Sequence, residues 1–315
     1  MPSELDNWTA QIRAGDVRAI SRAITAIENR DARAEELLER LSPAAGNAYL
    51  VGVTGAPGTG KSTLVDRLAT HYRTQGREVG IIAADPTSPY SGGAILGDRI
   101  RMQRHAGDAG VFIRSMATRG FLGGLASATA DVALLLDAAG KQIVLIETVG
   151  VGQDEIDVVR LADCTLLVLV PGLGDEVQSM KAGLMEIADI FVINKAEREG
   201  ADRLEQQIQA TLQLVPEDEQ MRPAVVRTTA SEGRGIEELA AAIEQFRSRP
   251  VLEDNRRAKR QELWKRRLIV LLGERLVEHA MSRPGGERLL ESLAAEVADR
   301  RKTPHAAVRE WMAEL

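Results

Sequence analysis

The stretch Gly55-Ala56-Pro57-Gly58-Thr59-Gly60-Lys61-Ser62 decides the fold predicted for this chain. It fits the pattern G-x-x-x-x-G-K-[ST], in which glycines let the backbone bend until successive N–H groups face inward around a polyphosphate. The helix expected after this loop adds the positive end of its dipole. Lys61 is expected to reach the β- and γ-phosphates, and the Ser62 hydroxyl to ligate Mg²⁺. The stretch therefore predicts a P-loop nucleotide site.

The segments on either side of the loop are the ones that this motif requires. Residues 49–54 form a short β-prone run, and the residues from Thr63 to Ala69 have a helical pattern. A glycine-rich turn with an incidental lysine would need neither neighbour. We therefore predict that the residues from Gly55 to Thr63 bind nucleotide.

The bulk composition limits the classes of protein to which the chain can belong. Its 315 residues are 44% hydrophobic and 3% aromatic, so we expect one large domain, or one domain with extensions, around an aliphatic core. The formal net charge of -6 argues against a general nucleic-acid binder. The single cysteine, Cys164, cannot form an internal disulfide, which indicates a reducing compartment.

The apolar content of the chain also bears on its location. The segment Met1–Asp6 has neither the basic region nor the apolar region of a secretory signal. No apolar run approaches the roughly 18 residues that a membrane span needs. We expect a cytoplasmic protein that neither spans a membrane nor binds nucleic acid.

Strand-like and helix-like segments alternate from residue 47 to residue 250. The strand candidates are mostly continuous apolar runs, which are typical of strands buried on both faces. They are 49–54, 78–84, 111–114, 143–148, 165–170, 189–193 and 223–228. The helix candidates are 60–75, 121–138, 175–187, 201–214 and 235–248. This alternation predicts an α/β domain with a doubly wound, mostly parallel sheet, whose ligands collect at the carboxyl ends of the strands.

Helical segments flank this predicted domain on both sides. Residues 1–46 are expected to form a helical extension packed on it, because Ile20, Ile24 and Ile27 share one helix face. Residues 251–315 contain a long amphipathic helix, a Pro-Gly-Gly break and two further helices. Such a tail suits the surface of a homodimer, which we predict, although folding back on its own domain is equally compatible with the pattern.

The segment Asn194-Lys195-Ala196-Glu197 bears on the choice between guanine and adenine. It follows an apolar strand and is similar to the N-K-x-D motif of G proteins, whose acid accepts hydrogen bonds that guanine offers and adenine does not. Here the acid is Glu197, one methylene longer than aspartate, so we expect GTP and GDP as ligands and leave the strictness over ATP open. The segment Thr229-Ala230-Ser231 is similar to the G-protein loop that contacts guanine through backbone groups.

Three acidic residues are candidates for a magnesium site. Glu147 ends a buried strand where G proteins have a D-x-x-G motif, whose acid holds Mg²⁺ and whose glycine senses the γ-phosphate. The alternative for Glu147 is a strand-end carboxylate that caps a helix. Asp85 ends another strand, and Asp98 lies further along the chain. Because a water-bearing Mg²⁺ site needs only one or two carboxylates, the sequence does not decide which of them ligate the ion beside Ser62. Lys61, Glu147 and Asp98 are the predicted catalytic residues.

Several longer runs carry a resemblance to a known family. Each is more specific than the P-loop, and together they cover nearly the whole chain from about residue 15. They are Asp85–Met102, Ser115–Gly120 with Gly123–Leu125, Glu147–Gln153, Gly172–Asp175, Lys181–Gly183 and Glu186–Asp189. In these runs the chain resembles the MeaB/ArgK family of GTPases, which belong to the SIMIBI branch of P-loop proteins.

The resemblance implies a function that the motifs alone do not. It implies a chaperone of an adenosylcobalamin-dependent acyl-CoA mutase, with methylmalonyl-CoA mutase as the usual client, which gates cofactor loading and protects the mutase from inactivation. It also implies a homodimer held by carboxy-terminal helices. Carried over by motif, Gln178 and Lys181 fall in a mobile segment that answers to the partner. Val151 stands where ordinary GTPases have a water-orienting glutamine, and Gln153 comes later, so we expect slow intrinsic hydrolysis that the mutase accelerates.

Two other functions remain open at this stage. One is a kinase linked to amino-acid transport, which would need a base that activates the acceptor and a substrate pocket. The other is a metal-insertion GTPase of the same branch, which usually has tracts rich in His or Cys. This chain has one cysteine and four scattered histidines, namely His71, His105, His279 and His305.

Overall fold

The computed structural model describes residues 3–85, 103–105, 107–117, 124–148, 161–172, 188–213, 222–249 and 252–313. The chain divides into two compact units, Met1–Arg260 and Gln261–Leu315. The division falls within one long helix, α11 (Leu252–Ser282). The predicted limits of the three regions, at residues 46 and 250, stay predictions.

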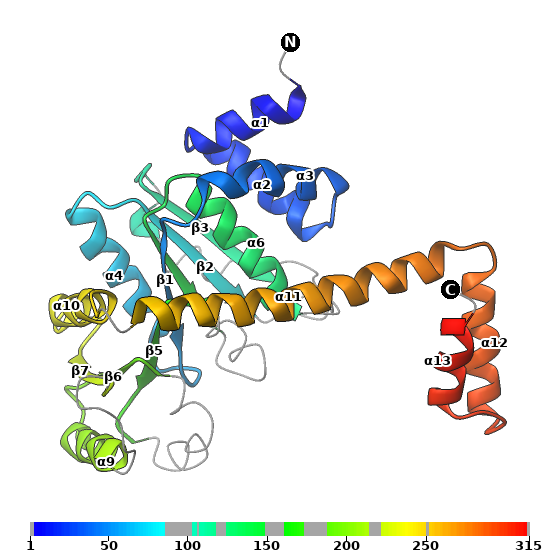
Figure 1. The fold of residues 1–315 in the computed structure, drawn as a ribbon. Coiled ribbons are helices and arrows are strands. Elements are labelled where there is room, and N and C mark those ends of the chain that lie inside the picture. Colours follow the sequence, from blue (N-terminus) through cyan, green and yellow to red (C-terminus); the bar gives the residue numbers. More distant parts are fainter. Residues whose placement is uncertain are drawn as a thin grey trace. The chain divides into compact units, whose positions relative to one another are not determined.

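The first unit is built on a seven-stranded sheet in which each paired strand runs parallel to its neighbour (Figure 1). The strand order is β3-β2-β4-β1-β5-β6-β7. The strands are β1 (Tyr49–Thr54), β2 (Val79–Asp85), β3 (Val111–Ala117), β4 (Ile143–Glu147), β5 (Cys164–Leu169), β6 (Ile190–Asn194) and β7 (Ala224–Thr228). All seven predicted strands are confirmed within a few residues, and so is the α/β fold.

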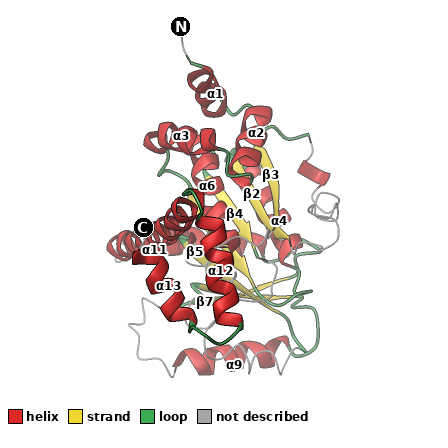
Figure 2. Cartoon of the chain, turned by 90° about the vertical axis from the view of Figure 1, so that its right-hand side faces the viewer, coloured by secondary structure: helices red, strands yellow, loops and turns green. Residues whose placement is uncertain are grey.

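The apolar runs form strands because both faces of the sheet are covered by helices (Figure 2). Every residue of β5 is buried, including Cys164, as expected for a small buried side chain. Alternate residues enter different clusters: Leu166 packs on one face of the sheet and Leu167 on the other. The sheet is therefore doubly wound, as predicted.

Helices α4 (Lys61–Thr74) and α10 (Ile236–Arg247) pack together on one face of the sheet, and α6 (Gly124–Ala138) and α9 (Ala201–Gln213) supply apolar residues on the other. A short 3-10 helix, η2, spans Gln103–His105. The predicted helix 175–187 lies outside the described residues. The arrangement leaves the carboxyl ends of the central strands as the place where loops from both faces meet.

The amino-terminal segment forms α1 (Glu4–Arg13), α2 (Val17–Glu28), α3 (Ala32–Leu41) and the 3-10 helix η1 (Ser42–Ala44). The first three start at side-chain caps, and Ser3 forms a reciprocal capping box with Asp6. Ile20 and Ile24 are fully buried in a cluster that includes Leu136 of α6. The predicted packing of this extension on the nucleotide domain is confirmed.

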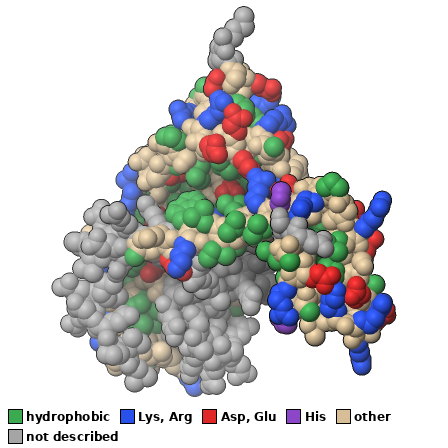
Figure 3. Space-filling model, turned by 45° about the vertical axis from the view of Figure 1, so that its right-hand side comes forward, with side chains coloured by type: hydrophobic (Ala, Val, Ile, Leu, Met, Phe, Trp, Pro, Cys, Tyr) green, Lys and Arg blue, Asp and Glu red, His purple; other side chains and the backbone are tan. Residues whose placement is uncertain are grey.

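The second unit contains the end of α11 together with α12 (Gly286–Ala298) and α13 (Pro304–Ala313). The predicted break lies at Gly285, whose φ of 87° is in the left-handed region that favours glycine. Large apolar side chains remain exposed on α11, including Leu268 (66% exposed) and Leu272 (60% exposed). Figure 3 shows green hydrophobic side chains at the surface among charged ones on the carboxy-terminal helices, at the right of the view.

Among the described residues, the helices are too short or too polar for any of them to cross a membrane.

Candidate nucleotide-binding site

The loop at 55–60 connects β1 to α4 and needs glycine at two positions for steric reasons. Gly55 has φ 144°, and a Cβ there would lie 2.3 Å from the carbonyl oxygen of Val168. Gly60 has φ 93°, and its Cβ would lie 2.5 Å from the side-chain nitrogen of Asn194. The loop therefore lies tightly between β5 and the end of β6, which fixes the direction of its peptide groups.

Lys61 follows this loop at the first position of α4, and its side chain turns back onto the loop. Its side chain is 6% exposed, and its Nζ donates to the carbonyl oxygens of Gly55 at 2.7 Å and Ala56 at 3.1 Å. The Thr59 hydroxyl donates to the same Ala56 carbonyl at 2.9 Å. The ammonium is thus held over the peptide groups that are expected to surround the phosphates.

Ser62 and Glu147 meet at the carboxyl edge of the sheet. The Ser62 hydroxyl donates to Oε1 of Glu147 at 2.6 Å, and the Glu147 side chain is 7% exposed. In the parallel register Glu147 of β4 pairs with Ala83 of the neighbouring strand β2. Strand β2 continues for two more residues and ends at Asp85. A hydroxyl and a carboxylate oxygen this close are the hard donors that Mg²⁺ prefers, so these residues fit that ion.

Thr148 is the residue after Glu147, and it is hydrogen-bonded to β1. Its backbone N–H donates to the Val53 carbonyl at 3.0 Å, and its hydroxyl donates to the Thr54 hydroxyl at 3.1 Å. Both threonines are buried. This pair holds the start of the segment after β4 beside the start of the P-loop, and the sequence interpretation did not single it out.

Asn194, at the end of β6, joins three parts of the site. Its side chain is 2% exposed, and its Nδ2 donates to the Thr59 carbonyl at 2.8 Å. Its Oδ1 accepts from the Thr228 hydroxyl and from the Ala230 N–H, both at 3.1 Å. The amide therefore connects the P-loop to β7 and to the 229–233 turn, which lies far from it in sequence. Lys195 adds a bond from its Nζ to the Gly58 carbonyl at 2.7 Å.

Glu197 lies beside Thr229, as expected for two residues predicted to select the base. The Thr229 hydroxyl donates to Oε2 of Glu197 at 3.0 Å. The hydrogen bond from its own backbone N–H, followed by the bond from Thr229, lowers the pKa of Glu197 below 4.5, although partial desolvation opposes this. Glu197 is therefore an anion at neutral pH, able to accept hydrogen bonds from a base.

The structure brings together the predicted residues of the phosphate and base regions. Arg67, on α4, also belongs to this cluster: its Nε donates to the Ala230 carbonyl at 3.0 Å and its Nη2 to the Ser231 carbonyl at 2.7 Å. Sequence reasoning missed Arg67, because an arginine on an amphipathic helix carries no motif. The predicted Asp98, Gln153, Gln178 and Lys181 lie outside the described residues, as do Val151 and the side chain of Asp85.

Comparison with known proteins decides the family. Residues 20–285 match the model of the family described as methylmalonyl Co-A mutase-associated GTPase MeaB. This chain belongs to the MeaB family. It is also 54% identical over 246 residues to a protein of Pyrococcus abyssi named as a GTPase, which covers 77% of this chain and 76% of that protein.

Two further relatives of the MeaB-family chain extend the comparison. The mouse (Mus musculus) methylmalonic aciduria type A homolog, mitochondrial, is 36% identical over 240 residues, covering 75% of this chain and 58% of that protein. The crystal structure of a LAO/AO transport system kinase superposes with a TM-score of 0.71 at 27% identity, covering 99% of this chain and 98% of that one. The chain is a P-loop GTPase that binds guanine nucleotide and hydrolyses GTP.

Proposed function

We propose that this GTPase is a chaperone of an adenosylcobalamin-dependent acyl-CoA mutase, methylmalonyl-CoA mutase or a close relative. In this role it gates cofactor loading and protects the mutase from inactivation. The observation that carries the proposal is the match of residues 20–285 to a family described as associated with that mutase. We also propose a cytoplasmic location, which the single buried cysteine supports.

The residues of the site have separate roles in the proposed GTPase cycle. Lys61 and the peptide N–H groups of the loop bind the β- and γ-phosphates, which is consistent with the ammonium lying over the Gly55 and Ala56 carbonyls. Ser62 holds Mg²⁺ together with Glu147, either directly or through water, and Asp85 and Asp98 are the further candidates. When bound, Mg²⁺ supplies positive charge against the phosphate oxygens.

The base is selected by the residues at the far end of the same cluster. Glu197, oriented by Thr229, accepts from guanine, while Lys195 covers the base plane and Asn194 holds the loop. The 3.0 Å contact between Thr229 and Glu197 supports this assignment, because it fixes the longer side chain that replaces the usual aspartate.

The hydrogen bond between Ser62 and Glu147 also suggests how a change from GTP to GDP is transmitted from the site to other parts of the protein. Glu147 ends β4 and is followed by Thr148, which is bonded to β1. A change in the ligands of Ser62 therefore acts on the start of the Glu147–Gln153 run. We propose that Gln153, Gln178 and Lys181 respond to the partner, and that hydrolysis is slow until the mutase binds, since Val151 replaces the usual glutamine.

We propose a homodimer formed through α11. Trp264, Leu268, Leu272 and Leu276 recur every four residues along this helix and are at least 43% exposed. Residues at this spacing lie on one helix face. An apolar stripe of this length suits the corresponding stripe of a second copy.

The experiment that tests the mutase proposal measures GTP turnover with candidate mutases added one at a time. We expect a rise of about tenfold or more in kcat with the client and none with an unrelated enzyme. The Lys61→Ala variant is the matched control, because it should bind the mutase without turning over. Fast turnover by the protein alone, unchanged by every adenosylcobalamin mutase tested, would contradict the proposal.

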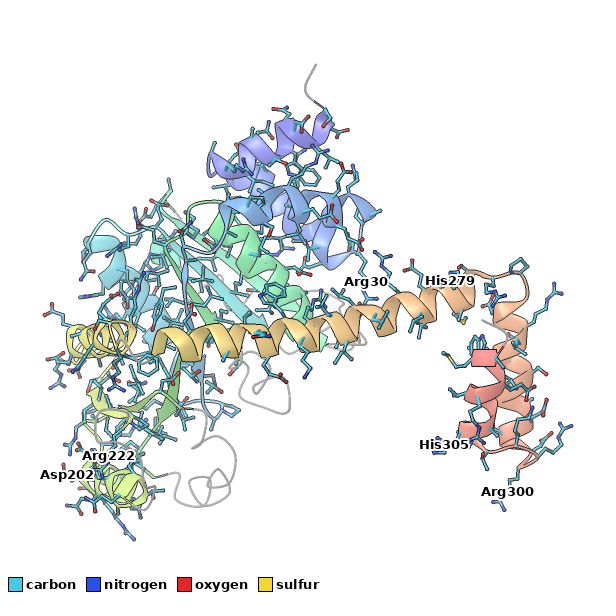
Figure 4. All side chains as sticks on the ribbon, in the orientation of Figure 1. Arg30, Asp202, Arg222, His279, Arg300 and His305 are labelled. Atoms are coloured by element: carbon cyan, nitrogen blue, oxygen red, sulfur yellow. The ribbon has the colours of Figure 1, made fainter. Side chains whose placement is uncertain are left out.

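A second candidate function is a kinase, because the superposed crystal structure bears that name. The same reactions can be run with γ-labelled GTP and ATP. Label that moves only to water supports the chaperone, whereas label on a protein or small-molecule acceptor supports the kinase. A metal-insertion role has less support: the described residues include no group of three or more His, Cys, Asp or Glu suited to a metal ion, and Figure 4 shows His279 and His305 on different carboxy-terminal helices.

A further inference from the structure

Arg67 joins the helix of the phosphate site to the turn of the base site. It lies on α4, the helix that begins with Lys61 and Ser62, and is half-buried. Its guanidinium donates to two successive carbonyls of the turn, those of Ala230 at 3.0 Å and Ser231 at 2.7 Å. A planar guanidinium that donates from two nitrogens fixes the direction of both acceptors, which a single donor would not do.

The turn that Arg67 contacts is closed by its own backbone. Thr229 and Arg234 form an antiparallel bridge, and the N–H of Glu232 donates to the Thr229 carbonyl at 2.9 Å. The N–H of Gly233 donates to the Ala230 carbonyl at 3.2 Å. These bonds set the internal shape of the turn but attach it to nothing else. Its attachment to α4 comes from Arg67, and its attachment to β6 comes from Asn194.

The two attachments fix the peptide groups on either side of Ala230. The N–H of Ala230 is held by Asn194, and its carbonyl accepts from Arg67 and, within the turn, from the Gly233 N–H. In a planar trans peptide the C=O and the following N–H point in opposite directions. The carbonyl of Ala230 points to Arg67, so the N–H of Ser231 points away from α4, on the side of the turn that is not occupied by the guanidinium.

We propose that Arg67 is a positioning residue for base selection, because it turns the Ser231 N–H toward the carbonyl group of the guanine ring. Adenine has an amino group at the corresponding position, which would meet this N–H donor to donor and leave both groups unsatisfied. Arg67 acts through the turn and does not touch the nucleotide. This role rests on the proposed base site and needs no mutase to be bound.

The test compares nucleotides that share the diphosphate and differ in the base. GDP and inosine diphosphate carry the ring carbonyl, whereas ADP does not. In Arg67→Met, which keeps the apolar stem and removes the donors, we expect the Kd for GDP and for inosine diphosphate to rise together by about tenfold. The Kd for ADP should change by less than about threefold, so the GDP preference falls.

Arg73→Met is the matched control on the same helix. Arg73 donates to Asp108 at 2.8 and 2.9 Å and to the Arg77 carbonyl, but to none of the 229–233 turn, so its loss should leave the ratio of the Kd values for GDP and ADP unchanged. Circular dichroism and thermal melting confirm that each variant is folded. If Arg67→Met does not fold, Arg67→Lys is the variant that tests the proposal. Lysine keeps the charge but cannot donate from two nitrogens in one plane. The ratio of the Kd values for GDP and ADP should then shift in the same direction by a smaller factor.

Three results would overturn the proposal. In the first, GDP and ADP lose affinity by the same factor, which would make Arg67 a general support of the fold. In the second, the folded Arg67 variants keep the wild-type ratio. In the third, the affinity for GDP falls while the affinity for inosine diphosphate does not. The substitution would then affect recognition of the exocyclic amine, which faces Glu197 in the proposed site, and not recognition of the ring carbonyl.

Discussion

The nucleotide domain buries its large apolar side chains, whereas the long carboxy-terminal helix α11 leaves several of them exposed. In the domain, Leu68 of α4 and Leu166 of β5 are fully buried in one cluster. On α11, Leu268 and Leu272 are mostly exposed. Burying a leucine contributes roughly 1.5–3 kcal/mol, so the domain gains this stabilisation within one chain and the helix gains it only against another surface. The apolar residues of the domain are covered by the domain itself, whereas those of α11 form the surface of the proposed dimer.

The polar groups show the same contrast. Asn194 is buried, and both its oxygen and its nitrogen are hydrogen-bonded to other segments of the domain. On the carboxy-terminal helices, Arg275 pairs with Glu278 within one exposed helical turn, whereas Lys302 links Glu296 of α12 to Glu310 of α13. Exposed pairs such as Arg275 with Glu278 contribute about 0–1 kcal/mol, so they add little to the stability of the tail. Because the two regions differ in this way, a variant in one region can serve as the control for a variant in the other.

The largest effect is expected from Leu68→Ala in the domain core. Removing a fully buried leucine leaves a cavity and should lower the free energy of unfolding by about 2–5 kcal/mol. Val308→Ala on α13, a residue 59% exposed, should change it by less than about 0.5 kcal/mol. Denaturant unfolding of both variants measures the difference, and equal losses would contradict the contrast between the regions.

Lys61→Ala should abolish tight nucleotide binding while leaving the tail unaffected. Losing the ammonium that lies over the loop removes charge-assisted bonds to phosphate, so we expect the Kd for GDP to rise by about a hundredfold. Titration calorimetry measures the affinity, and sedimentation velocity should show an unchanged oligomeric state. Wild-type GDP affinity in this variant would contradict the assignment of the site.

Leu268→Glu combined with Leu272→Glu should act on the tail alone. Charges on the apolar stripe of α11 would convert the proposed dimer to a monomer, with the Kd for GDP unchanged within about twofold. Arg309→Glu, an exposed substitution on α13, is the control and should stay dimeric. A wild-type protein that sediments as a monomer at micromolar concentration would refute the dimer.

The smallest effect concerns pH and Glu197. Its pKa is lowered in the folded protein below 4.5, so its carboxylate persists as pH falls and is lost only when pH drops through that lowered value. The ratio of the Kd values for GDP and ADP should therefore stay constant from about pH 8 to about pH 5. Competition binding across this range measures it, and a transition near pH 6 would show that another group controls base selection.

Much of this architecture could be predicted because it is encoded locally. Strands such as 143–147 and 190–194 are continuous apolar runs, which are buried wherever they occur. The glycines at 55 and 60 signal a backbone that other residues adopt only with strain. Glu197 and Thr229 could be paired from motif similarity, and the structure places them in contact.

The remaining features depend on contacts between distant parts of the chain. Arg67 meets Ala230 across 163 positions, and Asn194 meets Thr59 across 135. Only the strand order, which places β1 beside β5 and β5 beside β6, brings these residues together.

The sequence by itself determined the α/β fold and the P-loop, because periodicity and glycine spacing act over a few residues, and it predicted the residues of the phosphate and base regions from motifs. The tertiary structure decided that Arg67 donates hydrogen bonds to the 229–233 turn and that Leu268 and Leu272 stay exposed on α11. A helical pattern shows which residues share a face, but what covers that face depends on how the elements pack.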